Sequence, residues 1–321
     1  MTELATLMPA PVDLTGYRLG PPQQAGALTV VPVWGPEHAG LVPPRGGLKL
    51  RRVVYYGDLE LHNGAPEGVA IVPLHIGYIQ HGAQNHALCS AALIAAGQTR
   101  RFENACCVQA GQGGYLQGRD QWFFVLPLEL RAEALRLRGT LGFAKLWDAI
   151  AKLNEAYGLP KRGHLEQILT RKRPILTQWQ SRLEPLPGQV GALFFVGERF
   201  AGMEITPSPR YFADMWMPLV CFAYGVAAWQ AEPEPRPAEP YRAGSLAELR
   251  AELERDRAAR MERVASWLAE PAAGGEWTVE EEERYLDLRL STVTGNGIAG
   301  QVVTRDGRPV YASLFSTRWE R

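Results

Sequence analysis

The stretch that decides the fold covers residues 72–115 and reads VPLHIGYIQHGAQNHALCSAALIAAGQTRRFENACCVQAGQGGY. It holds three of the six histidines and three of the four cysteines of the chain. A polar string, residues 82–86 (GAQNH), separates two apolar runs whose length and composition are typical of strands. We therefore expect the chemistry of this protein to lie where the polar string interrupts the strands.

Strand patterns continue on both sides of this stretch. Residues 28–34 (LTVVPVW) predict a strand, and Pro32 inside it favours an edge strand or a strand with a break over a central strand, because proline cannot donate to a ladder. Around Gly97 and Gln98, the runs 87–95 and 100–108 predict a hairpin. Further strands are predicted at residues 49–62, 68–74, 122–127, 191–205 and 280–315.

Helical periodicity begins after residue 127. Leu146, Ile150, Leu153 and Tyr157 repeat at helical spacing, and residues 141–157 are predicted as an amphipathic helix. A second helix is predicted over residues 210–229, opened by the capping pair of Ser208 and Pro209. The change of period indicates an α+β fold with a mainly antiparallel, multi-stranded β core and flanking helices.

The domain organisation follows from these patterns and from one proline-rich segment, residues 231–240 (AEPEPRPAEP). In the strand-rich C-terminal region, the pair of Asp306 and Gly307 predicts a hairpin turn with a positive φ at the glycine. The predicted units are an irregular arm (1–26), the α+β core (27–230), a Pro-rich linker (231–244), a charged amphipathic helix (245–271) and a β hairpin region that packs back on the core (276–321).

Composition excludes several classes of protein. Lys+Arg and Asp+Glu number 34 each, so the formal net charge is zero, and neither nucleic acid nor an acidic membrane is expected as a partner. The N-terminal residues lack the pattern of a signal peptide, and no apolar run reaches the roughly 18–20 residues that span a bilayer. A cytoplasmic protein is the expectation.

The candidate chemistry lies in the polar string. Gln84 and Asn85 each offer an acceptor and two donors, which can read a ribose, an amide or a nucleobase, and Gly82 allows close approach of the backbone. The alternative is that both amides satisfy backbone groups in a connection. No metal is expected, because the spacing of the histidines at 75, 81 and 86 fits no metal motif.

Four segments, in this order, resemble the ARG and Rhodanese-Phosphatase-superfamily-associated family, which is named for its association with ADP-ribosylglycohydrolase and rhodanese-phosphatase domains. They are residues 28–34, the central segment 82–111, the segment 183–216 with its P-G-Q-V-G strand, and the terminal hairpin 297–315. Relative to the family pattern, His86 replaces an arginine, Gln109 a glutamate and Tyr311 a histidine. Gly77 and Tyr78 stand where family members carry acidic residues.

The resemblance implies a cytoplasmic module that binds, or also processes, an ADP-ribose-type or NAD-derived nucleotide. The alternative is a non-catalytic interaction or scaffold subunit that has kept the fold and lost the site, with a protein as its partner. Neither catalytic residues nor a cofactor are assigned by the sequence. The ligand-binding residues that the resemblance implies are Gly82, Gln84, Asn85, His86, Gln109 and Tyr311.

Overall fold

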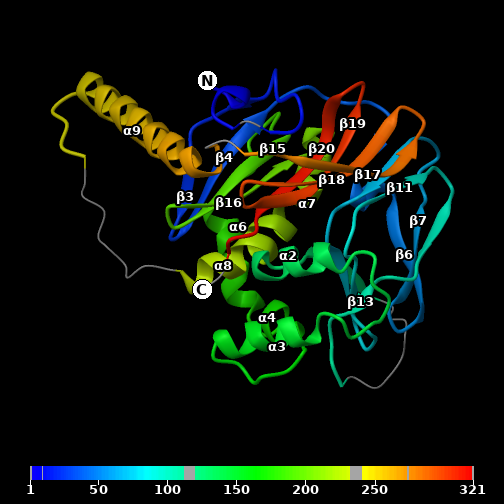
Figure 1. Cartoon of the computed structure of the whole chain (residues 1–321). Helices are drawn as coiled ribbons and strands as arrows, with labels where there is room; N and C mark the ends of the chain where they lie inside the picture. Colours follow the sequence, from blue (N-terminus) through cyan, green and yellow to red (C-terminus); the bar gives the residue numbers. More distant parts are fainter. Residues whose placement is uncertain (1, 9, 112–119, 232–240, 273–274, 320–321) are drawn as a thin grey trace.

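The computed structural model describes residues 2–8, 10–111, 120–231, 241–272 and 275–319 (Figure 1). Almost all strand pairs in these residues are antiparallel, the exception being one short pair, and helices cover the sheets. The predicted α+β class is confirmed.

The largest sheet combines strands from the start, the middle and the end of the chain. Its order is β1-β2-β4-β15-β16-β20-β19-β18-β17, and β3 pairs with β4 as well. The C-terminal strand β20 lies beside β16, and Tyr17 Oη donates to the carbonyl of Pro309 at 2.7 Å. The strands are β1 (Thr2–Glu3), β2 (Arg18–Leu19), β3 (Gln23–Ala25), β4 (Leu28–Trp34), β15 (Gly191–Val196), β16 (Arg199–Ile205), β17 (Thr278–Tyr285), β18 (Leu288–Gly295), β19 (Ile298–Arg305) and β20 (Arg308–Ser316).

Two expectations about the N-terminal strands need correction. The arm predicted as irregular over residues 1–26 contributes β1, β2 and β3 to the large sheet. Strand β4 is also not an edge strand, because β15 lies on one side and β2 and β3 lie on the other. Pro32 is tolerated there because it faces the gap between β2 and β3, where its carbonyl accepts from Gly20 N at 2.9 Å.

Three small sheets carry the central segment. The runs predicted as one hairpin separate: β11 pairs with β8, whereas β12 pairs with β7, so only the turn at Gly97 (φ 71°) is as predicted. One sheet holds β13 (Cys106–Cys107), β10 (His86–Ala87), β9 (Ile76–Gln80) and β14 (Gln121–Val125); another holds β11 (Ala92–Ala95), β8 (Val69–Val72) and β5 (Leu41–Val42); the third holds β12 (Thr99–Phe102), β7 (Asp58–Asn63) and β6 (Leu48–Tyr55).

Most of the helices lie on one side of the large sheet (Figure 1). Helix α3 begins at Trp147 and not at residue 141, because Gly142 adopts φ 110°, which a helix cannot contain. The helical elements are η1 (Leu4–Thr6), α1 (Pro44–Gly47), α2 (Leu128–Arg136), α3 (Trp147–Ala156), α4 (Glu166–Leu169), α5 (Arg173–Leu176), α6 (Gln178–Arg182), α7 (Pro209–Met217), η2 (Pro218–Ala223), α8 (Tyr224–Gln230) and α9 (Leu246–Ala272).

The elements α7, η2 and α8 form one apolar helical stretch under the sheet. Ser208 caps it as predicted, because its Oγ accepts from Tyr211 N at 3.2 Å. Within the described residues this stretch, Pro209–Gln230, is the one helix with the length and hydropathy to cross a membrane, which differs from the expectation that no run reaches that length. In this structure 78% of its apolar 18-residue window is buried among other parts of the protein.

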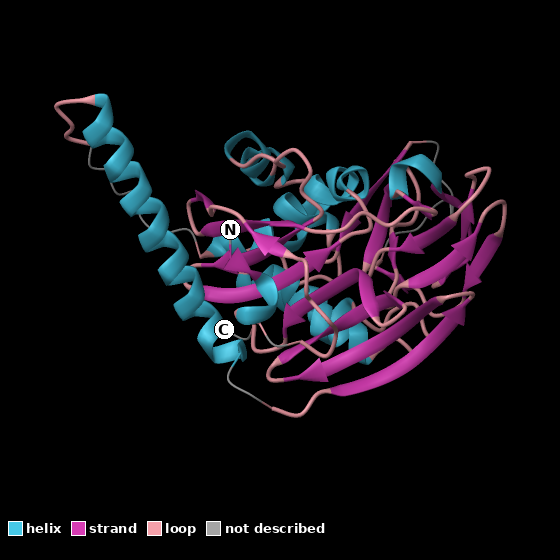
Figure 2. Ribbon diagram, turned by 90° about the horizontal axis from the view of Figure 1, so that it is seen from above, coloured by secondary structure: helices cyan, strands magenta, loops and turns pink. Residues whose placement is uncertain are grey.

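Strand β15 shows how the two faces of the large sheet are covered. Phe194 stacks on Tyr224 of α8 with ring centroids 4.1 Å apart, while Phe195 on the other face lies 5.3 Å from the ring of Trp267 in α9. Helix α9 therefore docks through its C-terminal half, and its N-terminal half extends away from the sheets (Figure 2). Most of the linker predicted at 231–244 lies outside the described residues.

Candidate functional site

The polar string forms a tight connection between β9 and β10. Gly82 adopts φ 69°, which allows the chain to turn after β9. Asn85 is 2% exposed, and its Oδ1 accepts from Gln80 N at 2.8 Å. The carbonyl of Gln84 accepts from Gln80 Nε2 at 2.5 Å. Asn85 and Gln80 thus hold the loop in one conformation.

A surface cleft with a volume of about 390 Å³ opens beside this loop. It brings together three of the predicted site residues, Gly82, Asn85 and Gln109, although Gln109 lies on a different segment. Seven of the ten described lining residues have polar side chains, and Trp122 adds an indole. Besides Gly82, Asn85 and Gln109, the lining comprises Ile79, Gln80, His81, Asp120, Trp122, Glu166 and Thr170.

Gln109 is the most informative residue of the cleft. Its backbone bridges to His164, which places the side chain next to the start of α4. There Gln109 Nε2 donates to Glu166 Oε2. Because a carboxylate only accepts, this contact fixes the orientation of the amide. Gln109 is 4% exposed, and its Oε1 is buried without a hydrogen-bond partner among the described residues.

The charges of the cleft are mostly negative. Asp120 and Glu166 both line it, and His81 is the one described lining residue that can carry a positive charge. The indole of Trp122 is partly buried, with the guanidinium of Arg173 lying 4.5 Å from its ring. Carboxylates and an unpaired amide oxygen are acceptors, so the cleft suits a ligand rich in hydroxyl or amine donors.

His86 and Gln84 point into the interior and are not among the described residues that line the cleft. His86 Nε2 accepts from Gly57 N at 3.3 Å, and its Nδ1 lies 3.4 Å from the carbonyl of Gln84, so the proton belongs on Nδ1. Burial lowers the pKa of His86 to about 4. Gln84 Oε1 accepts from Cys107 Sγ at 3.3 Å. Both side chains lie on the interior side of the loop, where their hydrogen bonds stabilise its conformation.

Tyr311 also lies away from the cleft. Its hydroxyl accepts from Leu74 N at 2.8 Å, and its ring lies 6.3 Å from that of Tyr211. The structure therefore places Tyr311 between strand β20 and the chain that leads into β9. Of the residues implied by the resemblance, Gly82, Asn85 and Gln109 converge on the cleft, whereas Gln84, His86 and Tyr311 do not line it.

A second polar cluster is buried around Arg131 of α2. Its Nη1 donates to Glu204 Oε1 at 2.8 Å, its Nη2 to Ser313 Oγ at 2.6 Å, and its Nε to His75 Nδ1 at 3.3 Å. His75 adopts φ 62°, and burial, followed by the charge of Arg131, holds its pKa well below the usual range. This cluster joins α2 to strands β16 and β20.

The buried thiols do not form a metal site. Cys89 and Cys106 lie with their sulfurs 3.9 Å apart, and both are buried. Among the described residues, no group of three or more His, Cys, Asp or Glu side chains is arranged to hold a metal ion.

Sequence reasoning did not name seven of the ten described lining residues as ligand-binding residues, among them Trp122, Glu166 and Thr170. Glu166 lies 57 residues after Gln109 and comes to it only through the pairing of Gln109 with His164. No local motif marks such a contact, so only the fold could reveal it.

The fold and the cleft define an α+β protein with a polar, carboxylate-bearing surface site. The family model of the ARG and Rhodanese-Phosphatase-superfamily-associated Protein domain matches residues 16–315. The chain belongs to this family, as the resemblance implied. No curated protein and no solved structure matched the chain.

Proposed function

We propose that this protein is a ligand-binding module whose cleft takes the ribose end of a nucleotide-type small molecule, of the ADP-ribose or NAD-derived class. One observation carries the proposal. Gln109 Oε1 is buried in the wall of a polar cleft with no partner among the described residues. An unsatisfied buried acceptor costs about 1–3 kcal/mol, and a ligand hydroxyl that reaches Oε1 after a small shift of the Gln109 side chain would remove that cost.

The other lining groups fit a ribose better than a phosphate. Two vicinal hydroxyls match the carboxylates of Asp120 and Glu166, which accept hydrogen bonds only. Asn85 uses Oδ1 for Gln80 N, and its Nδ2 has no hydrogen-bond partner among the residues that the structure describes, so it can donate to a ring or hydroxyl oxygen. Phosphates would be repelled by the two carboxylates and would extend into solvent.

Size agrees with this assignment. A volume of about 390 Å³ lies within the range of about 300–1,000 Å³ that is typical of small-molecule sites. It accommodates a nucleoside, with the remainder of a dinucleotide outside. The description of the family names an association with ARG, and the sequence resemblance implied an ADP-ribose-type ligand; both support this choice of ligand class.

The test is titration calorimetry with ADP-ribose, NAD, adenosine and ribose 5-phosphate. Two variants probe the cleft. Asn85→Asp keeps the oxygen that accepts from Gln80 N and removes the Nδ2 donor, while Gln109→Leu removes Oε1. We expect each change to weaken binding at least tenfold, which is about 1.4 kcal/mol. Glu155→Gln is the control, because Glu155 is an exposed carboxylate paired with Lys161 outside the cleft.

Thermal unfolding gives an independent readout. A ligand present at 100 times its Kd stabilises the folded state by about 2.7 kcal/mol, so a binding ligand must raise the melting temperature. If none of the four compounds gives a saturable heat or a thermal shift at millimolar concentration, the proposal is wrong. Equal affinity of wild type, Asn85→Asp and Gln109→Leu would place the ligand elsewhere.

The second candidate function is a non-catalytic interaction subunit. The observation that favours it is the N-terminal half of α9, which extends from the body with Leu246 77% exposed and Leu253 38% exposed (Figure 2). Exposed leucines on one helix are a common basis of helix-mediated association. Replacing both by glutamine should abolish association in a sedimentation experiment if this function holds, and should leave binding in the cleft unchanged.

A further inference from the structure

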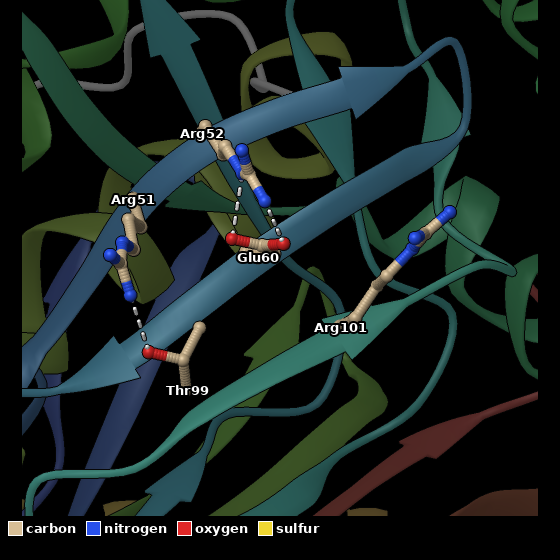
Figure 3. A pocket seen from close by; sticks show the side chains of 5 residues that line it. All are labelled: Arg51, Arg52, Glu60, Thr99 and Arg101. Carbon is tan, nitrogen blue, oxygen red and sulfur yellow. Dashed lines mark hydrogen bonds and ion pairs between the residues drawn. The ribbon is translucent and has the colours of Figure 1, made fainter.

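The outer face of the sheet formed by β6, β7 and β12 carries a cluster of arginines, which we call the arginine face: Arg51, Arg52 and Arg101 (Figure 3). A bulge creates it. The register of β6 against β7 shifts between Leu50 and Arg52, so Arg51 is an extra residue and both neighbouring arginines reach solvent. In a regular strand the two would point to opposite faces.

Two of these guanidiniums form ion pairs with carboxylates that are less exposed than the arginines. Arg52 donates through Nε and Nη2 to the two oxygens of Glu60, each at 2.8 Å. Arg101 makes the same kind of fork to Asp58, with Nε 3.0 Å from Oδ1. The arginine side chains are 56% and 46% exposed, whereas Glu60 and Asp58 are 12% and 10% exposed. In both pairs the guanidinium is therefore the group that meets solvent.

The guanidiniums keep unused donors. Within the described residues, Nη1 of Arg52 and Nη1 of Arg101 have no hydrogen-bond partner. Arg51 Nη1 donates to Thr99 Oγ1 at 3.2 Å, which directs this third guanidinium along the same face (Figure 3). A fork already fixed by a carboxylate loses little side-chain entropy when it binds a further anion.

A hollow of about 340 Å³ lies over the arginine face and is lined by its three arginines with Glu60 and Thr99. Glu103 lies 3.6 Å from Arg101 Nε, and its side chain is 69% exposed. The arginines hold the pKa of Glu60 below its ordinary value, Arg52 most strongly. Glu60 thus stays ionised and keeps its guanidinium in place.

We propose that the arginine face binds the phosphate group of a small molecule. Tetrahedral phosphate oxygens match several guanidinium donors that two strands, β6 and β12, present on one face of the sheet. The site is distinct from the cleft, because the described residues that line the two share no member. It therefore goes beyond the proposed nucleoside-binding function and does not depend on it.

The test titrates inorganic phosphate, pyrophosphate and methyl phosphate into the full chain at constant ionic strength, followed by calorimetry. The Nε–H signals of Arg52 and Arg101 in a ¹H–¹⁵N spectrum report the place of binding. We expect saturable binding that shifts these signals, and at least tenfold weaker binding in Arg51→Gln and Arg101→Gln. Arg257→Gln, an exposed arginine of α9, is the control and should bind as wild type does.

Arg51→Lys refines the test, because it keeps the charge and loses the planar fork; we expect an affinity between those of wild type and Arg51→Gln. Methyl phosphate binding as tightly as inorganic phosphate would indicate an organic phosphate ester as the ligand, and weaker binding would indicate the free anion. Thermal unfolding midpoints within a degree of wild type exclude misfolding as the cause.

Three results would overturn the proposal. The first is the absence of saturable binding of any of the three anions. The second is an equal loss of affinity in Arg257→Gln. The third is tighter binding of a glutamate-rich peptide or a single-stranded oligonucleotide than of pyrophosphate, since this would assign the face to a macromolecule.

Discussion

Arg131 and Glu204 form an ion pair in the interior of the protein, with their charged atoms 2.8 Å apart. The side chain of Arg131 has no exposed surface and that of Glu204 is 4% exposed. Tyr224 Oη donates to the same carboxylate oxygen at 2.7 Å. Helix α2 is therefore tied to the large sheet by charge as well as by apolar packing.

This pair gives the first prediction. Arg131→Leu should lower the free energy of unfolding by about 3–5 kcal/mol, because it leaves the buried Glu204 carboxylate without its counter-charge. Arg136→Leu on the same helix is the control: Arg136 pairs with Glu133 at the surface, and such a pair contributes only about 0–1 kcal/mol. Urea unfolding curves of both variants measure the difference. Equal losses in the free energy of unfolding would show that the buried pair stabilises the protein no more than the surface pair does.

Tyr311 gives a prediction that separates structure from binding. Tyr311→Phe removes the oxygen that accepts from Leu74 N and leaves this buried backbone donor unpaired. We expect a loss of about 1–3 kcal/mol in unfolding free energy. Affinity for ADP-ribose should not change, because Tyr311 is outside the described lining of the cleft. A change in affinity for ADP-ribose without a loss of stability would instead indicate that Tyr311 takes part in binding.

His86 makes stability depend on pH. Its pKa in the folded protein is about 4, below the ordinary value of 6.5, so the unfolded chain takes up a proton first as the pH falls. The contribution to stability is complete above pH 6.5 and is lost as the pH drops through 4. Loss of this titration should reduce the slope of unfolding free energy against pH by up to about 1.4 kcal/mol per pH unit in this window.

The comparison uses His86→Gln, which can still accept from Gly57 N and does not titrate. Chemical denaturation at several pH values between 4 and 7 gives both slopes. His81→Gln, an exposed change in the same loop, controls for the loss of a histidine. His75 keeps part of the acid sensitivity, because its pKa is also well below the usual range. An unaltered slope in His86→Gln would mean that His86 is not buried in its neutral form.

Gly307 tests the last hairpin. It adopts φ 77° in the turn between β19 and β20, as its pairing with Asp306 predicts. No atom lies within 4 Å of an added methyl group, so Gly307→Ala should cost about 1 kcal/mol through the backbone alone. Gly139→Ala, an equally open glycine without a positive φ, should be neutral or slightly stabilising. Melting temperatures that fall equally would contradict this account.

Local signals were sufficient for much of the fold. Ser208 as a helix cap and Gly307 as a turn glycine act within three or four residues, and such patterns can be recognised without coordinates. The edge position predicted from Pro32 was wrong because the partners of β4 on that side are two separate short strands, β2 and β3. The gap between them cannot be seen in the sequence. The same holds for the two strands around Gly97, which join different sheets.

The candidate site was predictable only in part. Gly82, Asn85 and Gln109 were named because the family resemblance singles out their segment, and they do meet at one cleft. The turn of the loop decides whether a side chain faces the cleft or the interior. The sequence alone therefore did not show that Asn85 faces the cleft while Gln84 and His86 face the interior. Glu166 depends on a contact between distant segments, for which the sequence offers no periodic or spacing signal.

The position of β20 beside β16 has a consequence for how the protein folds during its synthesis on the ribosome. Synthesis proceeds at about 5–20 residues per second, so the roughly 100 residues between these strands take about 5–20 seconds to appear. During that interval β16 has emerged while one of its edges still lacks its neighbour, and an unpaired edge attracts other chains. We expect the nascent protein to need a chaperone on that edge until its last strand leaves the exit tunnel.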